Sequence, residues 1–253
     1  MTEAVLTELM NAPIVERTVL HEWPLSRIER LKTEAGGTVI LKTQRAEASV
    51  ERDFYRRVRH PSLLRPLADG SLDGEDWMAL PDLGDTAEDW SSLTDGEIRT
   101  RVRGWQRVIA EYGDAPAFFD LSTPEKLTAL TDELLPVLTE DEEGARDLAQ
   151  KVRERLGAWY DAPTGLLHGD LKGENILASA EGSFVIDWQR PLLGPLPLEE
   201  ELALLLAGRE SAEVHAGLAR LFLACWYGWA WKTCLPVPFV RGMAQKYAAS
   251  VRE

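Results

Sequence analysis

The chain has 253 residues, of which 45% are hydrophobic, so it is long enough and apolar enough to bury a sizeable core. Its formal net charge of −14 disfavours binding to nucleic acid, because phosphate contacts need a basic surface. The same charge mildly favours a cationic ligand, although an acidic surface more often serves only solubility.

The cysteines and the first residues of the chain indicate a cytoplasmic protein. Cys225 and Cys234 have a spacing that fits neither a metal knuckle nor a redox pair, and so few cysteines are typical of a reducing compartment. We expect both to be small buried residues. The first 20 residues carry acids where a signal peptide needs basic residues. The most apolar run, residues 221–231, is shorter than the roughly 20 residues that a membrane span needs.

The first 83 residues read as a small antiparallel sheet with one helix. Residues 27–33 and 38–44 are short alternating runs, and the glycine pair between them suits a hairpin turn. Over residues 46–58 the apolar positions recur every four residues, which predicts a helix that ends at the following His-Pro pair. Two more strands around the turn at residues 72–76 would complete the sheet.

The rest of the chain is mainly helical in pattern, because apolar positions recur three and four residues apart. Helices are expected over residues 95–113, 123–139, 141–160, 199–208 and 211–233. The predicted fold is therefore α+β with two lobes. Residues 1–83 would form a small antiparallel β-sheet lobe with one helix, and residues 84–253 a larger, mainly helical lobe.

Residues 166–177, LLHGDLKGENIL, set several polar side chains between two apolar pairs. Solvated loops also have this density of polar residues. Residues 175–177 and 184–187, however, look like two short strands that follow the loop, with Glu181 and Gly182 in the turn between them. We therefore predict a loop that enters a β-hairpin.

That hairpin would bring Asn175 beside Asp187. An amide and a carboxylate together offer hard oxygen ligands for Mg²⁺, which takes one or two protein carboxylates and fills its other positions with phosphate and water. Asp170 lies on the loop before the hairpin, where it could accept the proton of an attacking hydroxyl. Lys172 could hold the transferring phosphoryl group as a point charge.

Two motifs carry a resemblance to a known family. His168-Gly169-Asp170 followed by Asn175, and then Ile186-Asp187-Trp188, resemble the catalytic loop and the metal motif of the aminoglycoside phosphotransferase and choline kinase-like family. The resemblance implies a protein kinase-like fold, with Asp170 as the catalytic base and His168 as a brace for the loop. It also implies that Asn175 and Asp187 are the Mg²⁺ ligands.

The same resemblance assigns residues to the nucleotide. Lys42 in VILKT matches the strand lysine that contacts the α- and β-phosphates. Glu51 matches the helix glutamate that pairs with this lysine, although Glu47 lies one helical turn earlier on the same face.

The linker and the loop over the phosphates depart from the family's pattern. Leu80 and Asp82 lie in the stretch WMALPDLGD, which fits the linker that holds the nucleotide base. Pro81 replaces the usual acid there and leaves the choice between ATP and GTP open. Residues 21–31 contain no glycine, although kinases use glycines to bring backbone amides to the phosphates, so Ser26 is a candidate substitute.

The residues that select the acceptor are less clear. Glu201-Leu202-Ala203 matches the family's Asp-Leu-Ala helix start, but favourable acids in a first helical turn are the preferred interpretation of this acidic run. Trp226, Tyr227, Trp229 and Trp231 have helical spacing, for which core packing is a more frequent reason than a pocket wall.

The function that the resemblance implies is transfer of the γ-phosphate of ATP or GTP, with Mg²⁺, to a hydroxyl of a small molecule. The acceptor would be an antibiotic, a sugar-like compound or an amino alcohol, and the charge of the chain hints at a cationic one. Resistance and metabolic roles both remain open, and so does the oligomeric state. We expect neither nucleic acid nor membrane as a partner.

Two alternatives stay open. A kinase-like nucleotide-binding protein without transfer activity is suggested by the glycine-free loop and by Pro81. A protein kinase shares Asp-Leu-Lys and Glu-Asn with the loop, but Gly169 stands where that class has arginine, residues 187–189 read DWQ in place of DFG, and no APE segment follows.

Overall fold

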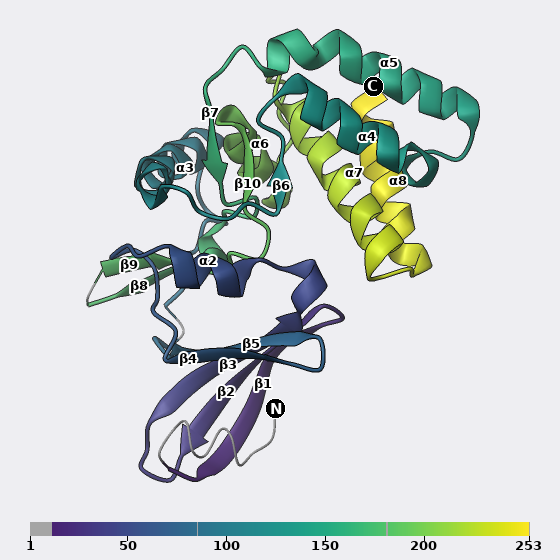
Figure 1. Ribbon diagram of the computed structural model, residues 1–253. Helices are drawn as coiled ribbons and strands as arrows, with labels where there is room; N and C mark the ends of the chain where they lie inside the picture. The colour runs from purple at the N-terminus through teal and green to yellow at the C-terminus, as the bar shows by residue number, and fades with distance from the viewer. Residues whose placement is uncertain (1–11, 85, 181, 253) are drawn as a thin grey trace.

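The computed structural model describes residues 12–84, 86–180 and 182–252 and has two lobes (Figure 1). The first lobe is a five-stranded sheet in the order β1-β2-β3-β5-β4, with every neighbouring pair antiparallel. Its strands are β1 (Ile14–Trp23), β2 (Ser26–Thr33), β3 (Thr38–Arg45), β4 (Ala68–Leu72) and β5 (Glu75–Pro81). The antiparallel N-lobe sheet is confirmed.

The edge strand β1 was not predicted from the sequence. All of its residues after Ile14 are exposed, so the strand has no buried face and lacks the alternation of apolar and polar residues that marks a half-buried strand. It nevertheless pairs with β2 along most of its length, from Ile14 opposite Thr33 to Trp23 opposite Ser26.

The predicted N-lobe helix is broken into two pieces. A short 3₁₀ turn, η1 (Ala46–Ala48), precedes the helix α2 (Glu51–Arg57). Phe54 and Tyr55 are buried, and the Phe54 ring stacks on Trp188, with ring centroids 4.2 Å apart and planes within 9°. This contact joins the first lobe to the second, and Figure 1 shows α2 at the junction of the two.

Six α-helices are described in the second lobe. They are α3 (Asp95–Ile109), α4 (Pro124–Leu138), α5 (Glu142–Trp159), α6 (Pro197–Leu206), α7 (Ala216–Thr233) and α8 (Pro238–Arg252). Four of them, α4, α5, α7 and α8, pack around one large apolar core, α3 packs in a second core, and α6 contributes to both. Five correspond to predicted helices, and α4 begins as expected with Thr123 as N-cap and Pro124 as first residue. Cys225 and Cys234 are both buried and free, as predicted.

The last helix, α8, was missed. Its buried face consists of Val240, Ala244, Ala248 and Val251. Two of these four are alanines, whose weak hydrophobicity gives little periodic signal, so only the packing against α7 reveals the helix. No helix in the described part of the chain is long and apolar enough to cross a membrane.

A short hairpin lies between the sheet and the large helices. Its strands β8 (Ile176–Ser179) and β9 (Gly182–Val185) pair with Ile176 opposite Val185, which confirms the predicted hairpin. Glu181, expected in the turn, lies outside the described residues. A three-stranded sheet, β6 (Phe119–Asp120), β10 (Leu192–Pro195) and β7 (Thr164–Leu167), supports the loop that leads into the hairpin. The lobe boundary after residue 83 remains a prediction.

Candidate active site

The loop of residues 168–175 connects β7 to the hairpin and is held from inside by His168. This side chain is buried, its Nδ1 accepts a hydrogen bond from the Asp170 N–H at 3.2 Å, and its Nε2 lies 2.8 Å from the carbonyl oxygen of Ile186. Burial lowers the pKa of His168, so the ring is neutral and donates from Nε2. His168 thus ties the loop to the hairpin, in the bracing role that the resemblance implied.

Gly169 fits a place that no larger residue fits. Its φ is +80°, and a Cβ atom there would lie 2.8 Å from the carbonyl oxygen of Arg190 and 2.7 Å from Leu192 Cδ2. The arginine that a protein kinase carries at this position would clash with both. The loop is therefore built differently from a protein kinase loop.

Asn175 and Asp170 are in direct contact. The Asn175 side-chain nitrogen donates to the Asp170 carbonyl at 2.8 Å and to its carboxylate at 3.2 Å. The amide oxygen of Asn175 takes no part in these two bonds, and an amide oxygen is one of the ligand types that Mg²⁺ accepts. The Ile186 N–H donates to the Asn175 carbonyl at 3.0 Å, so Asp187, the next residue, is brought to the same end of the hairpin.

Asp187 is held in an unusual backbone conformation, with φ at 68°. Burial raises the pKa of its carboxyl, but the neighbouring Lys42 lowers it further, to about 2, and the carboxylate is ionised at neutral pH. An ionised carboxylate and a nearby amide oxygen are hard oxygen donors, which suit Mg²⁺. The residues present therefore fit the cation that the resemblance implies.

Lys42 is buried between two acids. Its Nζ lies 2.6 Å from Glu51 Oε2 and 2.5 Å from Asp187 Oδ1. Glu51 also accepts a hydrogen bond from the Trp188 N–H at 3.1 Å, so it links β3, α2 and the segment that follows β9. Glu47, the alternative partner, is exposed and lies 3.7 Å from Arg45. The structure therefore places Glu51, and not Glu47, against the lysine.

Two cavities meet at Asp187. The larger, of about 240 Å³, lies between the lobes and is lined by Lys42, Glu51, Asn175, Asp187, Leu80 and Asp82, among others. The smaller, of about 210 Å³, is lined by Asp170, Lys172 and Ser26, and also by Asp187. Ser26 thus lies beside Asp170 in the smaller cavity, away from the linker residues with which it was grouped.

The linker at the larger cavity is stiffened by Asp82. Its carboxylate lies 2.8 Å from Arg30 Nε and accepts a hydrogen bond from the Gly84 N–H at 2.9 Å. Leu80 is buried, and Pro81 pairs with Val39 in the sheet. Since proline has no N–H, a base in this cavity would have to take its backbone donor from another linker residue.

Lys172 lies at the rim of the loop. It is about one-third exposed, and its Nζ is 3.7 Å from the Asp170 carboxylate and 3.4 Å from Glu174. Both distances exceed a good hydrogen bond, so the ammonium group acts on Asp170 through its charge.

Glu199, at the start of α6, contacts the candidate catalytic loop, although the sequence did not single it out. It is fully buried and accepts hydrogen bonds from the N–H groups of His168 at 2.5 Å and Gly169 at 3.1 Å. Glu200 instead pairs with Arg103 at 2.8 Å, and Glu201 pairs with Arg99. Of the three adjacent glutamates, Glu199 is therefore the one that contacts the loop.

The Glu199 contacts predict a pH effect on stability. Burial raises the pKa of Glu199 from 4.5 to about 7, against the lowering effect of the backbone hydrogen bonds. The folded protein therefore keeps this proton to higher pH than the unfolded chain, and the stabilisation is full below about pH 4.5 and lost as the pH rises through 7. Glu199→Gln, which cannot titrate, should flatten this decline in urea unfolding measured from pH 4.5 to 8. An unchanged slope would contradict the assignment.

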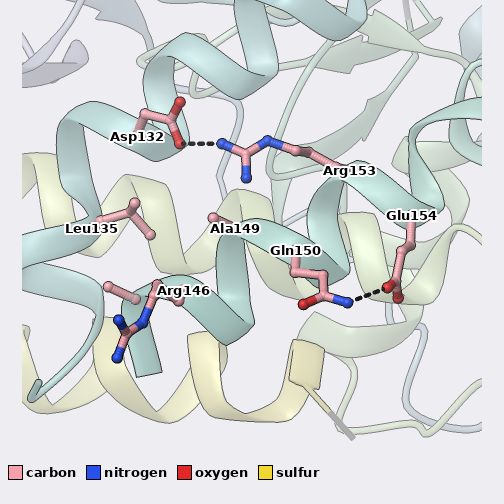
Figure 2. Close-up of a pocket in the computed structure, with 8 residues that line it drawn as sticks. Asp132, Leu135, Arg146, Ala149, Gln150, Arg153 and Glu154 are labelled. Atoms are coloured by element: carbon pink, nitrogen blue, oxygen red, sulfur yellow. Dashed lines mark hydrogen bonds and ion pairs between the residues drawn. The ribbon is translucent and has the colours of Figure 1, made fainter. Parts of the chain in front are cut away.

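A wider hollow of about 610 Å³ lies elsewhere, on the surface between α4 and α5 (Figure 2). Two pairs of its lining side chains already contact each other: Asp132 lies 3.8 Å from Arg153, and Gln150 donates to Glu154 at 2.8 Å. None of the candidate active-site residues lines it, so its size does not make it the site.

A cavity between a small sheet lobe and a helical lobe, closed by a loop with an aspartate and an asparagine, is the arrangement of kinase-like phosphotransferases. The family model described as "Phosphotransferase enzyme family" matches residues 27–233, which is most of the chain. The chain belongs to this family and is one of its kinases. A search of the curated proteins finds no match.

Solved structures of several small-molecule kinases share the fold. The macrolide 2′-phosphotransferase MphH from Brachybacterium faecium aligns with a TM-score of 0.61 and 14% identity, covering 96% of this chain and 95% of that one. The choline kinase LicA from Streptococcus pneumoniae aligns with a TM-score of 0.59 and 13% identity, covering 99% and 98%. The amicoumacin kinase hAmiN, in complex with AMP-PNP, Ca²⁺ and Ami, aligns at 0.60 and 11%, covering 98% and 92%. These identities show a common fold and no common acceptor.

Proposed function

We propose that this kinase transfers the γ-phosphate of ATP or GTP to a hydroxyl group of a small molecule, with Mg²⁺ as the metal. Antibiotics, sugar-like compounds and amino alcohols are the acceptor classes that the family resemblance suggests. The amicoumacin kinase, which shares this fold, was solved with a nucleotide analogue and a divalent cation, and this supports the need for both.

The observation that carries the proposal is the meeting of the two cavities at Asp187. The larger contains the buried lysine and the linker, as a nucleotide site requires. The smaller contains Asp170, where a base must lie to receive the proton of an acceptor. A nucleotide in the first and a hydroxyl compound in the second would therefore meet beside the carboxylate that could hold the metal.

Each candidate site residue then has one role in the proposed reaction. Lys42 contacts the α- and β-phosphates, and Glu51 holds Lys42 in place. Asn175 and Asp187 hold Mg²⁺, which would neutralise charge on the phosphates. Asp170 orients the acceptor hydroxyl and takes its proton, and Lys172 supplies positive charge near the transferring group. Catalysis is mainly positioning and charge neutralisation, since this reaction leaves little covalent work to the protein.

The test is a screen of purified protein with ATP and GTP against hydroxylated antibiotics, amino sugars and small hydroxy acids, with and without Mg²⁺. We expect Mg²⁺-dependent nucleotide turnover that rises with at least one acceptor and stops when EDTA removes the metal. Nucleotide binding without any turnover, for every acceptor, would instead favour a binding protein without transfer activity. Phosphorylation of a peptide in preference to all small molecules would favour a protein kinase.

A further inference from the structure

The smaller cavity has walls from both lobes. Trp23, at the end of β1, and Ser26 come from the first lobe, and Trp226 and Tyr227 come from α7 in the second. The Trp226 ring stacks on Trp229, with centroids 5.3 Å apart, and the Tyr227 ring stacks on Tyr247 of α8, with centroids 5.9 Å apart. The aromatic side chains of α7 therefore serve the core and also form a rigid pocket wall.

The charges in this cavity differ from those of the whole chain. Its two carboxylates already face cations: Asp187 contacts Lys42, and Asp170 lies 3.7 Å from Lys172 and 3.9 Å from Arg190. Of the charged side chains that line the cavity, two are acids, Asp170 and Asp187, and two are cations, Lys172 and Arg190, so their charges balance. The net charge of −14 is therefore spread over other surfaces, and it does not make this cavity a cation site.

Arg190 is held against the Trp226 ring and faces Asp170 as a charge partner, without a hydrogen bond to it. Its guanidinium carbon lies 4.1 Å from the centroid of the Trp226 ring, and it is about one-quarter exposed. It lies 3.9 Å from the Asp170 carboxylate, beyond hydrogen-bond distance, and it donates no side-chain hydrogen bond to any residue within the described ranges. A stacked guanidinium with free donors is preorganised to bind a carboxylate through two parallel hydrogen bonds.

We propose that the acceptor is a small hydroxyl compound that carries a carboxylate, bound by Arg190, with its flat or apolar body against Trp226 and Tyr227. This proposal rests on the proposed function and specifies its substrate class. A cationic acceptor would find both carboxylates of the cavity already facing a lysine or an arginine, and it would add like charge beside Lys172 and Arg190. The volume of about 210 Å³ is below the roughly 300–1,000 Å³ of sites for drug-sized ligands, so a compound of one or two rings fits best.

Three probes of equal shape test the charge preference. They are 4-(hydroxymethyl)benzoate, 4-(hydroxymethyl)benzamide and 4-(hydroxymethyl)benzylamine, titrated by ligand-observed NMR into the full chain with Mg²⁺ and AMP-PNP. We expect the benzoate to bind at least tenfold more tightly than the benzylamine, with the benzamide between them. Equal or tighter binding of the benzylamine, or no binding of the benzoate, would overturn the proposal.

Variants then test whether Arg190 causes the preference for the carboxylate probe. Arg190→Gln should reduce the benzoate-to-benzylamine ratio to below about threefold, leaving only the charge of Lys172, while Arg190→Lys should retain an intermediate ratio. Arg153→Gln, in the hollow between α4 and α5, is the matched control and should leave the ratio unchanged. A ratio that survives Arg190→Gln would overturn the role of Arg190.

This outcome is separable from the proposed function. Mg²⁺-dependent nucleotide turnover is measured on the same preparation. If turnover is present but the amine probe binds best, the charge assignment fails and the kinase assignment stands. If the benzoate binds as expected but no nucleotide is turned over with any acceptor, the proposed phosphotransfer is contradicted, while the carboxylate preference of the cavity is supported.

Discussion

Asp170→Asn is expected to lower kcat by about 10²- to 10⁴-fold, the range that a positioned general base contributes. The asparagine keeps the size of the side chain but cannot take the proton of the acceptor hydroxyl. Because Asp170 lines the smaller cavity and not the larger one, nucleotide affinity should change little. Turnover with the best acceptor and binding of AMP-PNP by calorimetry measure the two effects separately.

The matched control for this variant is Asp132→Asn, which makes the same chemical change in the hollow between α4 and α5 (Figure 2). Turnover of the control should equal that of the unmodified chain. Near-normal kcat for Asp170→Asn with the true acceptor would show that Asp170 is not the general base. A parallel loss of AMP-PNP binding would instead show that the substitution disturbs the whole loop.

The sequence predicted most of the elements because their signals are local. The hairpin at residues 176–185, the capped start at Thr123 and the glycine pair before β3 each depend on a few neighbouring residues. Strand β1 and helix α8 were missed because their apolar signal is weak: β1 has no buried residue, and alanines make up half of the buried face of α8. Elements of this kind are stabilised by their partners and not by their own pattern.

The site divides in the same way. The sequence could predict that Asp170, Asn175 and Asp187 lie near one another, because the loop and the hairpin place them by short-range geometry. Glu199 and Arg190 make contacts between segments that are distant in the sequence. Glu199 of α6 contacts the loop at His168, and Arg190 contacts Trp226 of α7. No spacing along the chain predicts these contacts. Because the three glutamates are consecutive, the sequence also does not show which of them contacts the loop.

The buried pair of Lys42 and Glu51 carries the largest expected effect on stability. Both side chains are almost inaccessible to solvent, and Glu51 accepts from the Trp188 N–H as well. Glu51→Ala removes one of the two acids beside Lys42 and leaves a buried N–H without its acceptor. Removing one partner of a buried ion pair costs about 3–5 kcal/mol, so we expect a loss of this size in the free energy of unfolding.

Glu47→Ala is the matched control, because it removes an exposed glutamate of the preceding 3₁₀ turn that pairs with Arg45. Urea unfolding followed by circular dichroism should show a large fall in the midpoint for Glu51→Ala and none for Glu47→Ala. AMP-PNP binding should also weaken only for Glu51→Ala, because Lys42 would be drawn to Asp187 alone and away from the phosphates. Equal effects of the two variants would mean that the position of Lys42 does not depend on Glu51. The assignment of Lys42 and Glu51 to the nucleotide site would then be contradicted.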